Sequence, residues 1–282
     1  MPIRPCSITG ECVRVSARHV ADGMALSAEA GWNQVAADWS LMIRLGDGFG
    51  IADPEGKLIA SGFALRYLPE FGWISLILVA KSVRRRGFAT WILQRIIEHL
   101  ERNQLVPVLD ATPAGEAVYT ALGFRAIEPL TRWRGEGGGT AAPPVPSASP
   151  DDFGQILALD RQAFGADRSD ILTDFLGRPG TVCFSDPHGR GFVMSRLGQT
   201  VRQLGPLVAT DETAAVQLLD RALAAVGGPV LIDVPDRETM MCRRLLAQGF
   251  TAERPFMRMA LGRDRGFGCP EMIHAAAGPE YG

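Results

Sequence analysis

The residues of this chain with the clearest chemical potential form a basic turn in its first half. Arg84, Arg85 and Arg86 are followed directly by Gly87, and Ala89 comes two positions later. Guanidinium groups attract anions, and small residues let the backbone approach a phosphate closely. The combination predicts a site for a phosphate or pyrophosphate group.

Two regular elements position this turn. Residues 73–80 form an apolar run typical of a buried strand, and residues 87–102 carry apolar side chains at helical spacing. The turn would stand at the start of the helix, where backbone N–H groups lack intrahelical partners and the helix dipole is positive. The spacing matches neither a dinucleotide-binding GxGxxG sequence nor a Walker loop, because no Gly-Lys-Ser/Thr follows.

A tyrosine follows in the next pair of elements. Residues 105–110 predict a short strand, and residues 116–122 predict a short helix that carries Tyr119 and ends before Gly123. Taken alone, Tyr119 is equally explained as a half-buried aromatic side chain, with Gly123 as the helix C-cap. The basic turn upstream favours a catalytic role.

Together these segments resemble the GCN5-related N-acetyltransferase (GNAT) family. The turn is similar to the Arg/Gln-x-x-Gly-x-Gly/Ala loop that holds the pyrophosphate of acetyl-CoA, and the tyrosine segment is similar to the family's Ala-x-x-x-Tyr-x-x-x-Gly-Phe helix and turn. The resemblance implies acetyl-CoA as cosubstrate, with no metal. The residues it assigns to acetyl-CoA are Leu78, Val79, Arg84, Arg85, Arg86, Gly87, Phe88, Ala89 and Thr90.

The resemblance also implies a mechanism in which a neutral amine attacks the thioester directly. The family uses a backbone N–H on the strand before the turn, here that of Leu78 or Val79, to stabilise the developing oxyanion. Tyr119 takes the role of the acid that protonates the departing thiolate.

The general base is less clearly marked. Many relatives carry a glutamate on the strand before the turn, whereas residues 73–79 contain no carboxylate. Water held by backbone groups, Asp110 or Glu29 could take the role. Either carboxylate is equally explained as a capping or solvated group.

The acceptor site is expected near the first two helices. Gly31-Trp32-Asn33 resembles the loop that some tandem relatives place over the acceptor. The same three residues also fit a helix C-cap glycine, a buried tryptophan and an N-cap asparagine. The predicted substrate-binding residues are Glu29, Trp32, Asn33 and Trp73.

Composition excludes several other classes of protein. The chain has 282 residues, of which 46% are hydrophobic and 21% charged, so it can build packed cores. A net charge of −2 gives no basic field for nucleic acid. The five cysteines and four histidines are scattered without metal-binding spacing. The absence of an apolar signal segment and of a membrane-length apolar run predicts a cytoplasmic protein that does not bind membranes.

A glycine- and proline-rich stretch, residues 135–148, predicts an exposed linker between two halves, 1–134 and 149–282. Both halves show a similar order of strands and helices, and both end with a helix, a Gly-Phe pair and a strand. We therefore expect an α/β (α+β) protein built from two tandem acyl-CoA N-acyltransferase folds. The resemblance gives each a mixed, mostly antiparallel sheet flanked by helices.

The second half lacks the chemistry of the first. Asp211 and Glu212 occupy the position of the basic turn, and no tyrosine lies on the helix before Gly249. Carboxylates suit a helix N-terminus by themselves but would repel a pyrophosphate. We therefore expect the first half to be catalytic and the second to be a degenerate copy that shapes the substrate pocket.

The predicted function is transfer of an acetyl group from acetyl-CoA to a primary amine of a small molecule, through a ternary complex. A protein N-terminus or lysine is an alternative acceptor. Two further alternatives are an acyl-CoA-binding sensor without turnover and a dimerising interaction module without cofactor. A homodimer is compatible with each of these predictions.

Overall fold

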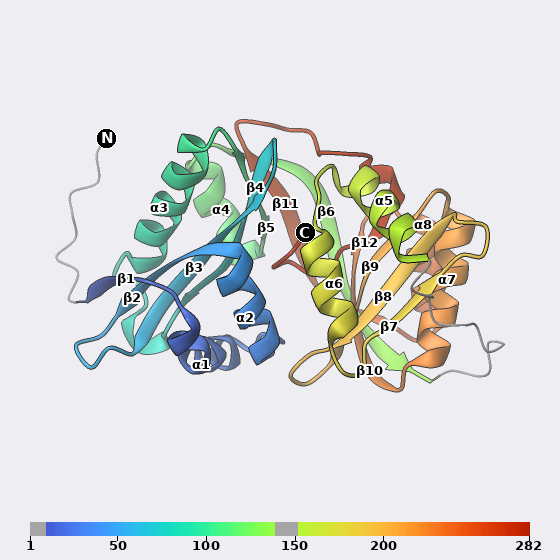
Figure 1. The fold of residues 1–282 in the computed structure, drawn as a ribbon, viewed down its shortest axis with the longest axis horizontal. Coiled ribbons are helices and arrows are strands. Elements are labelled where there is room, and N and C mark those ends of the chain that lie inside the picture. Colours follow the sequence, from blue (N-terminus) through green and yellow to red (C-terminus); the bar gives the residue numbers. More distant parts are fainter. Residues whose placement is uncertain (1–9, 139–151) are drawn as a thin grey trace. The chain divides into compact units, whose positions relative to one another are not determined.

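A computed structural model describes residues 10–138 and 152–282 (Figure 1). The chain separates into two compact units, Met1–Pro107 and Val108–Gly282. This division falls earlier than the predicted linker. Residues 135–137, predicted as the start of that linker, instead continue strand β6 (Phe124–Gly137) and pair with β10 (Gly228–Pro235). Residues 139–148 of the predicted linker lie outside the described residues.

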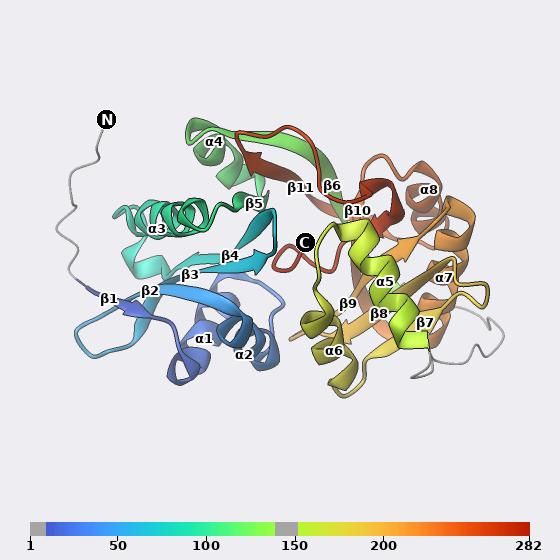
Figure 2. The ribbon, with the colours of Figure 1, turned by 45° about the horizontal axis from the view of Figure 1, so that its top comes forward.

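Within its described residues, the first unit contains four antiparallel strands covered by helices on both faces. Its strands, in spatial order, are β1 (Glu11–Arg14), β2 (Gly46–Ala52), β3 (Leu58–Tyr67) and β4 (Phe71–Val79). Its helices are α1 (Val20–Ala30), α2 (Ala36–Leu45) and α3 (Phe88–Arg102). Figure 2 shows α1 and α2 on one face of the sheet and α3 on the other.

Packing of α3 on the sheet sets the position of the basic turn. The apolar stripe of the helix, which includes Ile92 and Ile96, is buried. It lies against Gly62 of β3, where an added Cβ would stand 2.6 Å from Ile92 and 2.9 Å from Ile96. A glycine here lets the helix approach the sheet closely. The N-terminus of α3 is thereby held close to the sheet, shortly after the end of β4.

The second unit is built around a longer mixed sheet. Its strand order is β5 (Val106–Ala111), β11 (Thr251–Leu261), β6, β10, β9 (Arg202–Ala209), β8 (Gly191–Leu197) and β7 (Val182–Ser185), with β12 (Ile273–Ala275) paired to β9. Only β9 and β10 run parallel among the pairs that the structure describes in this unit. Because β11 lies between β5 and β6, a strand from the end of the chain joins strands from its first half.

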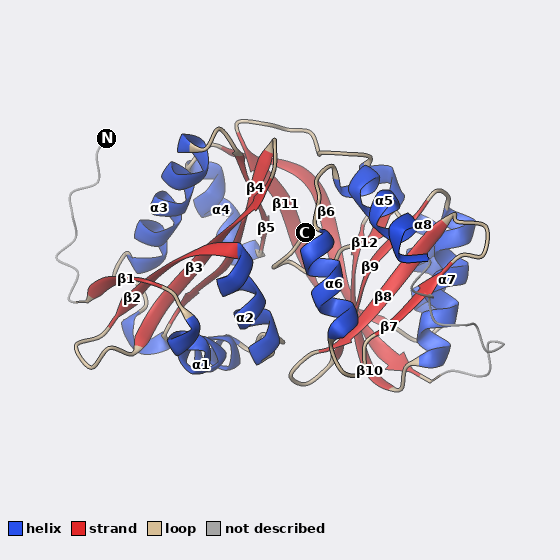
Figure 3. Ribbon diagram, in the orientation of Figure 1, coloured by secondary structure: helices blue, strands red, loops and turns tan. Residues whose placement is uncertain are grey.

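Among the described residues, five helices accompany the strands of this unit. They are α4 (Pro113–Ala121), α5 (Phe153–Phe164), α6 (Ser169–Gly177), α7 (Glu212–Ala225) and α8 (Thr239–Ala247). Figure 3 shows α5 and α6 on one side of the strands and α7 on the other. Leu218, Leu219 and Leu245 belong to an apolar core that α7 and α8 help to form. The predicted α/β class and the mostly antiparallel sheet are confirmed. No helix among the described residues is long and apolar enough to span a bilayer.

Candidate active site

The basic turn has the geometry predicted for an anion site. A 3₁₀ turn (Lys81–Val83) follows β4, and Gly87 caps α3 in a left-handed conformation with φ 85°. The first helical hydrogen bond is donated by Trp91 to the Gly87 carbonyl (2.9 Å), and no side chain caps the helix. Backbone N–H groups before Trp91 therefore lack acceptors within the helix. A helix N-terminus in this state favours a bound anion.

The space in front of this turn can accept a phosphate group. A Cβ built on Gly87 meets nothing within 4 Å, and the three arginines before it are exposed. Arg84 Nε donates to the Val79 carbonyl at 3.1 Å, which ties the turn to the end of β4. The residues present thus fit the pyrophosphate of acetyl-CoA.

Glu29 supports the same turn from α1. Its carboxylate accepts a hydrogen bond from the Lys81 backbone N–H at 3.0 Å. It also lines a hollow of about 260 Å³ beside residues 80–82, together with Asp22 and Asp53. Those two carboxylates likewise accept backbone N–H groups, from Leu58 at 3.0 Å and Lys57 at 2.8 Å. Glu29 therefore has a structural contact and faces a hollow beside the turn.

The strand before the turn carries a bulge. Ser61 of β3 pairs with Leu78, and Phe63 pairs with Ser75, so Leu76 and Ile77 together face one residue of β3. Leu76 has φ 48°, a conformation that costs a non-glycine residue about 1 kcal/mol. Bulges of this kind change the direction of the peptide groups in a strand.

The pairing narrows the choice of oxyanion donor. The Ala80 N–H donates to the Ile59 carbonyl at 2.9 Å. Bonded pairs alternate along an antiparallel ladder, so Leu78 faces β3 with its N–H and Val79 faces away. Of the two predicted donors, the geometry favours Val79. The bulge makes the Ile77 N–H a further candidate donor. The sequence did not indicate this candidate, because no residue pattern marks the bulge.

Tyr119 lies on α4, half-buried beside Phe124, with ring centroids 5.8 Å apart. Its ring covers Gly115, where an added Cβ would stand 2.8 Å from Tyr119 Cε2. Burial raises the pKa of Tyr119, so its hydroxyl keeps its proton at neutral pH. Within residues 10–138 and 152–282, no hydrogen bond engages that hydroxyl. Tyr119 is thus available as a proton donor.

Asp110 is engaged in a buried ion pair. Arg258 of β11 donates Nε and Nη2 to its two carboxylate oxygens at 2.9 and 3.0 Å. The Asp110 side chain is 2% exposed. Both oxygens of this carboxylate are thus committed to a largely buried guanidinium. The geometry therefore argues against the predicted role of Asp110 as general base and assigns it to joining β5 with β11.

In the loop after α1, Gly31 is the helix C-cap that the sequence offered as an alternative to a substrate contact. Gly31 is a left-handed C-cap with φ 70°, and the Trp32 N–H donates to the Ser27 carbonyl at 2.9 Å. Asn33 is not the N-cap of α2. Val35 takes that position, and the Asp38 carboxylate accepts its N–H at 2.9 Å. Trp32 and Asn33 are half-buried, and their contact with substrate stays a prediction.

Trp73 is a core residue. Its side chain is 1% exposed, in the middle of β4 opposite Leu65. A side chain buried to this extent has no surface to offer an acceptor. The prediction that Trp73 binds substrate is therefore corrected by the structure.

At the corresponding turn of the second copy, a side chain of the chain itself occupies the helix N-terminus. Asp211 caps α7, and its carboxylate accepts the Ala214 N–H at 2.8 Å. This backbone bond is the main cause that lowers the Asp211 pKa. The N-terminus of α7 thus already holds an anionic group, whereas Gly87 at the start of α3 supplies none.

In the second copy, the gap between strands β9 and β10 is occupied by another segment of the chain. β9 and β10 pair over only three residues, ending at Leu204 and Ile232. Beyond that point β12 pairs with β9 at residues 207–208, and the Ala276 N–H donates to the Asp233 carbonyl of β10 at 2.9 Å. The C-terminal segment therefore occupies the gap between the two strands.

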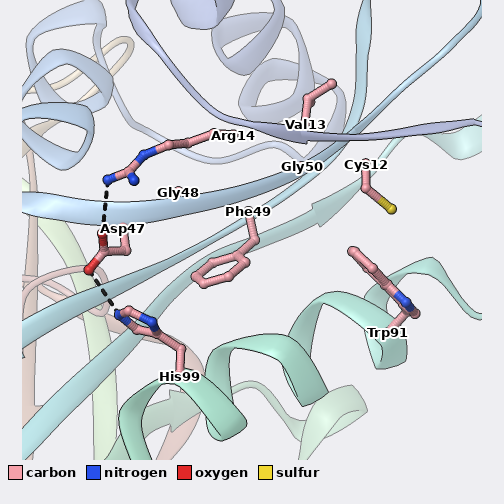
Figure 4. Close-up of a pocket in the computed structure, with 9 residues that line it drawn as sticks. All are labelled: Cys12, Val13, Arg14, Asp47, Gly48, Phe49, Gly50, Trp91 and His99. Carbon is pink, nitrogen blue, oxygen red and sulfur yellow. Dashed lines mark hydrogen bonds and ion pairs between the residues drawn. The ribbon is translucent and has the colours of Figure 1, made fainter. Parts of the chain in front are cut away.

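A second hollow, of about 310 Å³, lies between β1, β2 and α3 (Figure 4). The Asp47 carboxylate, which lines this hollow, accepts a hydrogen bond from Arg14 Nη2 at 2.9 Å and contacts His99 Nε2 at 2.9 Å. Its lining contains none of the predicted site residues. These contacts connect the edge strand to α3.

Comparison with known proteins gives the family. Residues 156–277 match the family model described as an acetyltransferase (GNAT) domain, and residues 50–133 match the model described as FR47-like protein. An uncharacterized N-acetyltransferase of Bacillus subtilis (strain 168), YitH, is 24% identical over 258 residues, which span 86% of this chain and 88% of that protein.

Solved structures show the same fold. A putative acetyltransferase from Pyrococcus horikoshii has a TM-score of 0.83 at 18% identity, covering 100% of this chain and 99% of the other. A tandem GNAT protein from the clavulanic acid biosynthesis pathway has a TM-score of 0.63 at 15% identity, covering 89% and 98%. The class defined by fold and site is that of acyltransferases. These matches together support a GNAT-family acyltransferase with two tandem domains.

Proposed function

We propose that this enzyme transfers an acetyl group from acetyl-CoA to a primary amine of a small molecule, by direct attack in a ternary complex. The observation that carries the proposal is the open anion site at Gly87, where α3 begins without a side-chain cap. The biosynthetic setting of the clavulanic acid relative supports a small-molecule acceptor. A homodimer stays an expectation.

Acetyl-CoA would supply the acetyl thioester. The N–H groups at the start of α3 and the neighbouring arginines would hold its pyrophosphate. The N–H groups of Val79 and Ile77, which face away from β3, would stabilise the oxyanion without reorganisation.

Tyr119 would donate its hydroxyl proton to the departing thiolate, a role that its protonated state suits. The amine must lose a proton before it attacks. Glu29 and water bound to backbone groups are the remaining candidates for that step, since Asp110 is occupied by Arg258.

We further propose that the first copy, residues 1–134, is catalytic and that the second, residues 149–282, serves a structural and pocket-shaping role. Two contacts support this division. Asp211 places a carboxylate on the N-terminus of α7, and β12 fills the gap beside β9. An enzyme with this arrangement binds one acetyl-CoA per chain.

The test is a free-thiol assay of the whole chain with acetyl-CoA and a panel of small amines, amino acids and peptides. We expect release of CoA with at least one small amine, and mass spectrometry should detect the N-acetylated product. Transfer to peptide N-termini or lysines alone would favour the protein-acceptor alternative. Binding of acetyl-CoA without transfer to any amine would favour the sensor alternative.

A further inference from the structure

Ser61 makes a single contact with the bulge in β4. Its hydroxyl donates to the Leu76 carbonyl at 3.0 Å, and the Ser61 side chain is fully buried. The acceptor belongs to the residue with φ 48°, where the strand departs from regular geometry. A buried hydroxyl in this position satisfies a carbonyl that the bulge removes from the regular ladder.

The neighbouring residue on β3 is adapted to the same bulge. A Cβ added to Gly62 would stand 2.5 Å from Ile77 Cδ1. A glycine opposite the bulge therefore leaves room for the extra residue of β4. Ser61 and Gly62 together build the bulge from the β3 side, so it is a specified feature of this sheet.

Peptide geometry connects Ser61 to one of the two proposed oxyanion donors, the Ile77 N–H. The Leu76 carbonyl and the Ile77 N–H belong to one planar trans peptide unit and point in opposite directions. Because Ser61 holds the carbonyl on the β3 side, the Ile77 N–H points away from β3. The serine hydroxyl thus fixes the orientation of this amide without touching anything on its far side.

We propose that Ser61 is a positioning residue for acetyl transfer, which holds the Leu76–Ile77 peptide so that its N–H is directed at the thioester carbonyl. This inference rests on the proposed function. An oxyanion donor is effective only when its direction is fixed before the reaction. Without the hydroxyl, the strained peptide at Leu76 can rotate and lose that direction.

The test compares Ser61→Ala with Ser27→Ala. Ser27 is also a fully buried serine in the first unit, and its Oγ accepts Trp39 Nε1 at 3.1 Å. Each variant deletes one buried hydrogen bond made by a hydroxyl, so both should lose similar thermal stability.

The two variants should differ in turnover. Removing an oxyanion-hole donor reduces kcat by about 10²–10³-fold, so misdirecting one should reduce kcat by at least ~10-fold in Ser61→Ala. The Kd for acetyl-CoA should stay within about 2-fold, because pyrophosphate binding is untouched. Ser27→Ala should keep the kcat of the unaltered enzyme.

A second readout is independent of turnover. Infrared difference spectra of carbonyl-labelled acetyl-CoA bound to each protein report polarisation of the thioester. The carbonyl band should shift to lower wavenumber in the unaltered enzyme and in Ser27→Ala, and less so in Ser61→Ala. Equal kcat values and equal band positions for the two variants would overturn the role of Ser61 while leaving acetyl transfer intact. Absence of acetyl-CoA binding by the unaltered chain would overturn both proposals.

Discussion

Gly87→Glu places a carboxylate at the point of the β4–α3 turn where the structure leaves open space. The new Cβ would meet nothing within 4 Å, so the side chain can be accommodated without displacing the core. Its charge would lie close to the position proposed for the pyrophosphate. The left-handed φ of 85° should cost about 1–2 kcal/mol of stability in any non-glycine residue.

The loss of affinity follows from charge repulsion. Two unit charges about 5 Å apart repel by about 1–3 kcal/mol for effective dielectric constants between about 80 and 20. A pyrophosphate carries more than one charge, so a loss of about 3 kcal/mol is expected. That corresponds to a Kd for acetyl-CoA raised by about 100-fold.

Gly56→Glu is the matched control. Gly56 has φ 83°, also lies in open space, and belongs to the turn between β2 and β3. Both variants carry the same strain and the same added charge. Calorimetric titration with acetyl-CoA should show the 100-fold loss only for Gly87→Glu. A folded Gly87→Glu protein with the affinity of Gly56→Glu would refute the assignment of the turn.

Three further predictions address other residues. Tyr119→Phe should lower the single-turnover rate of acetyl transfer by about 100-fold with unchanged acetyl-CoA affinity, and a normal rate would make Tyr119 a packing residue only. Arg258→Met should cost about 3–5 kcal/mol in denaturant unfolding, because it leaves the buried Asp110 carboxylate unpaired. Hydrogen bonds from Arg190 lower the pKa of Asp186 to about 2, so its stabilisation is present above the unfolded pKa and is lost as pH falls through about 2. Asp186→Asn should therefore reduce stability at pH 7 and flatten the acid limb of the unfolding profile.

Much of this fold could be predicted from local patterns. Helix α3 and strand β5 lie within one residue of the ranges predicted from periodicity, 87–102 and 105–110. Phe88, Ile92 and Ile96 are buried, as the helical spacing of α3 required. The basic turn was found for a similar reason, since arginines, a glycine and a helix start are adjacent in the sequence.

Features that depend on contacts between distant segments were missed. The insertion of β11 between β5 and β6 leaves no trace in the residues of any of these strands. Asp110 was predicted as a candidate general base because its partner, Arg258, lies on another strand far along the chain. β12 has only three residues, too few for a periodic signal.

The position of β11 between β5 and β6 also decides how the roles of the two copies can be tested. A fragment covering residues 149–282 would lose β6, the partner of both β10 and β11. Such a fragment would expose unpaired strand edges, which favours aggregation. Experiments on the division of roles therefore use the whole chain.

The most direct measurement is a crystal structure of the whole chain grown with saturating CoA. We expect one CoA per chain, with its pyrophosphate against the N–H groups at the start of α3 and close to Gly87. We also expect β12 to stay paired with β9 and no CoA to lie at Asp211. A pyrophosphate bound at the N-terminus of α7, or a CoA that leaves the Gly87 turn untouched, would contradict the assignment of the anion site to the first copy.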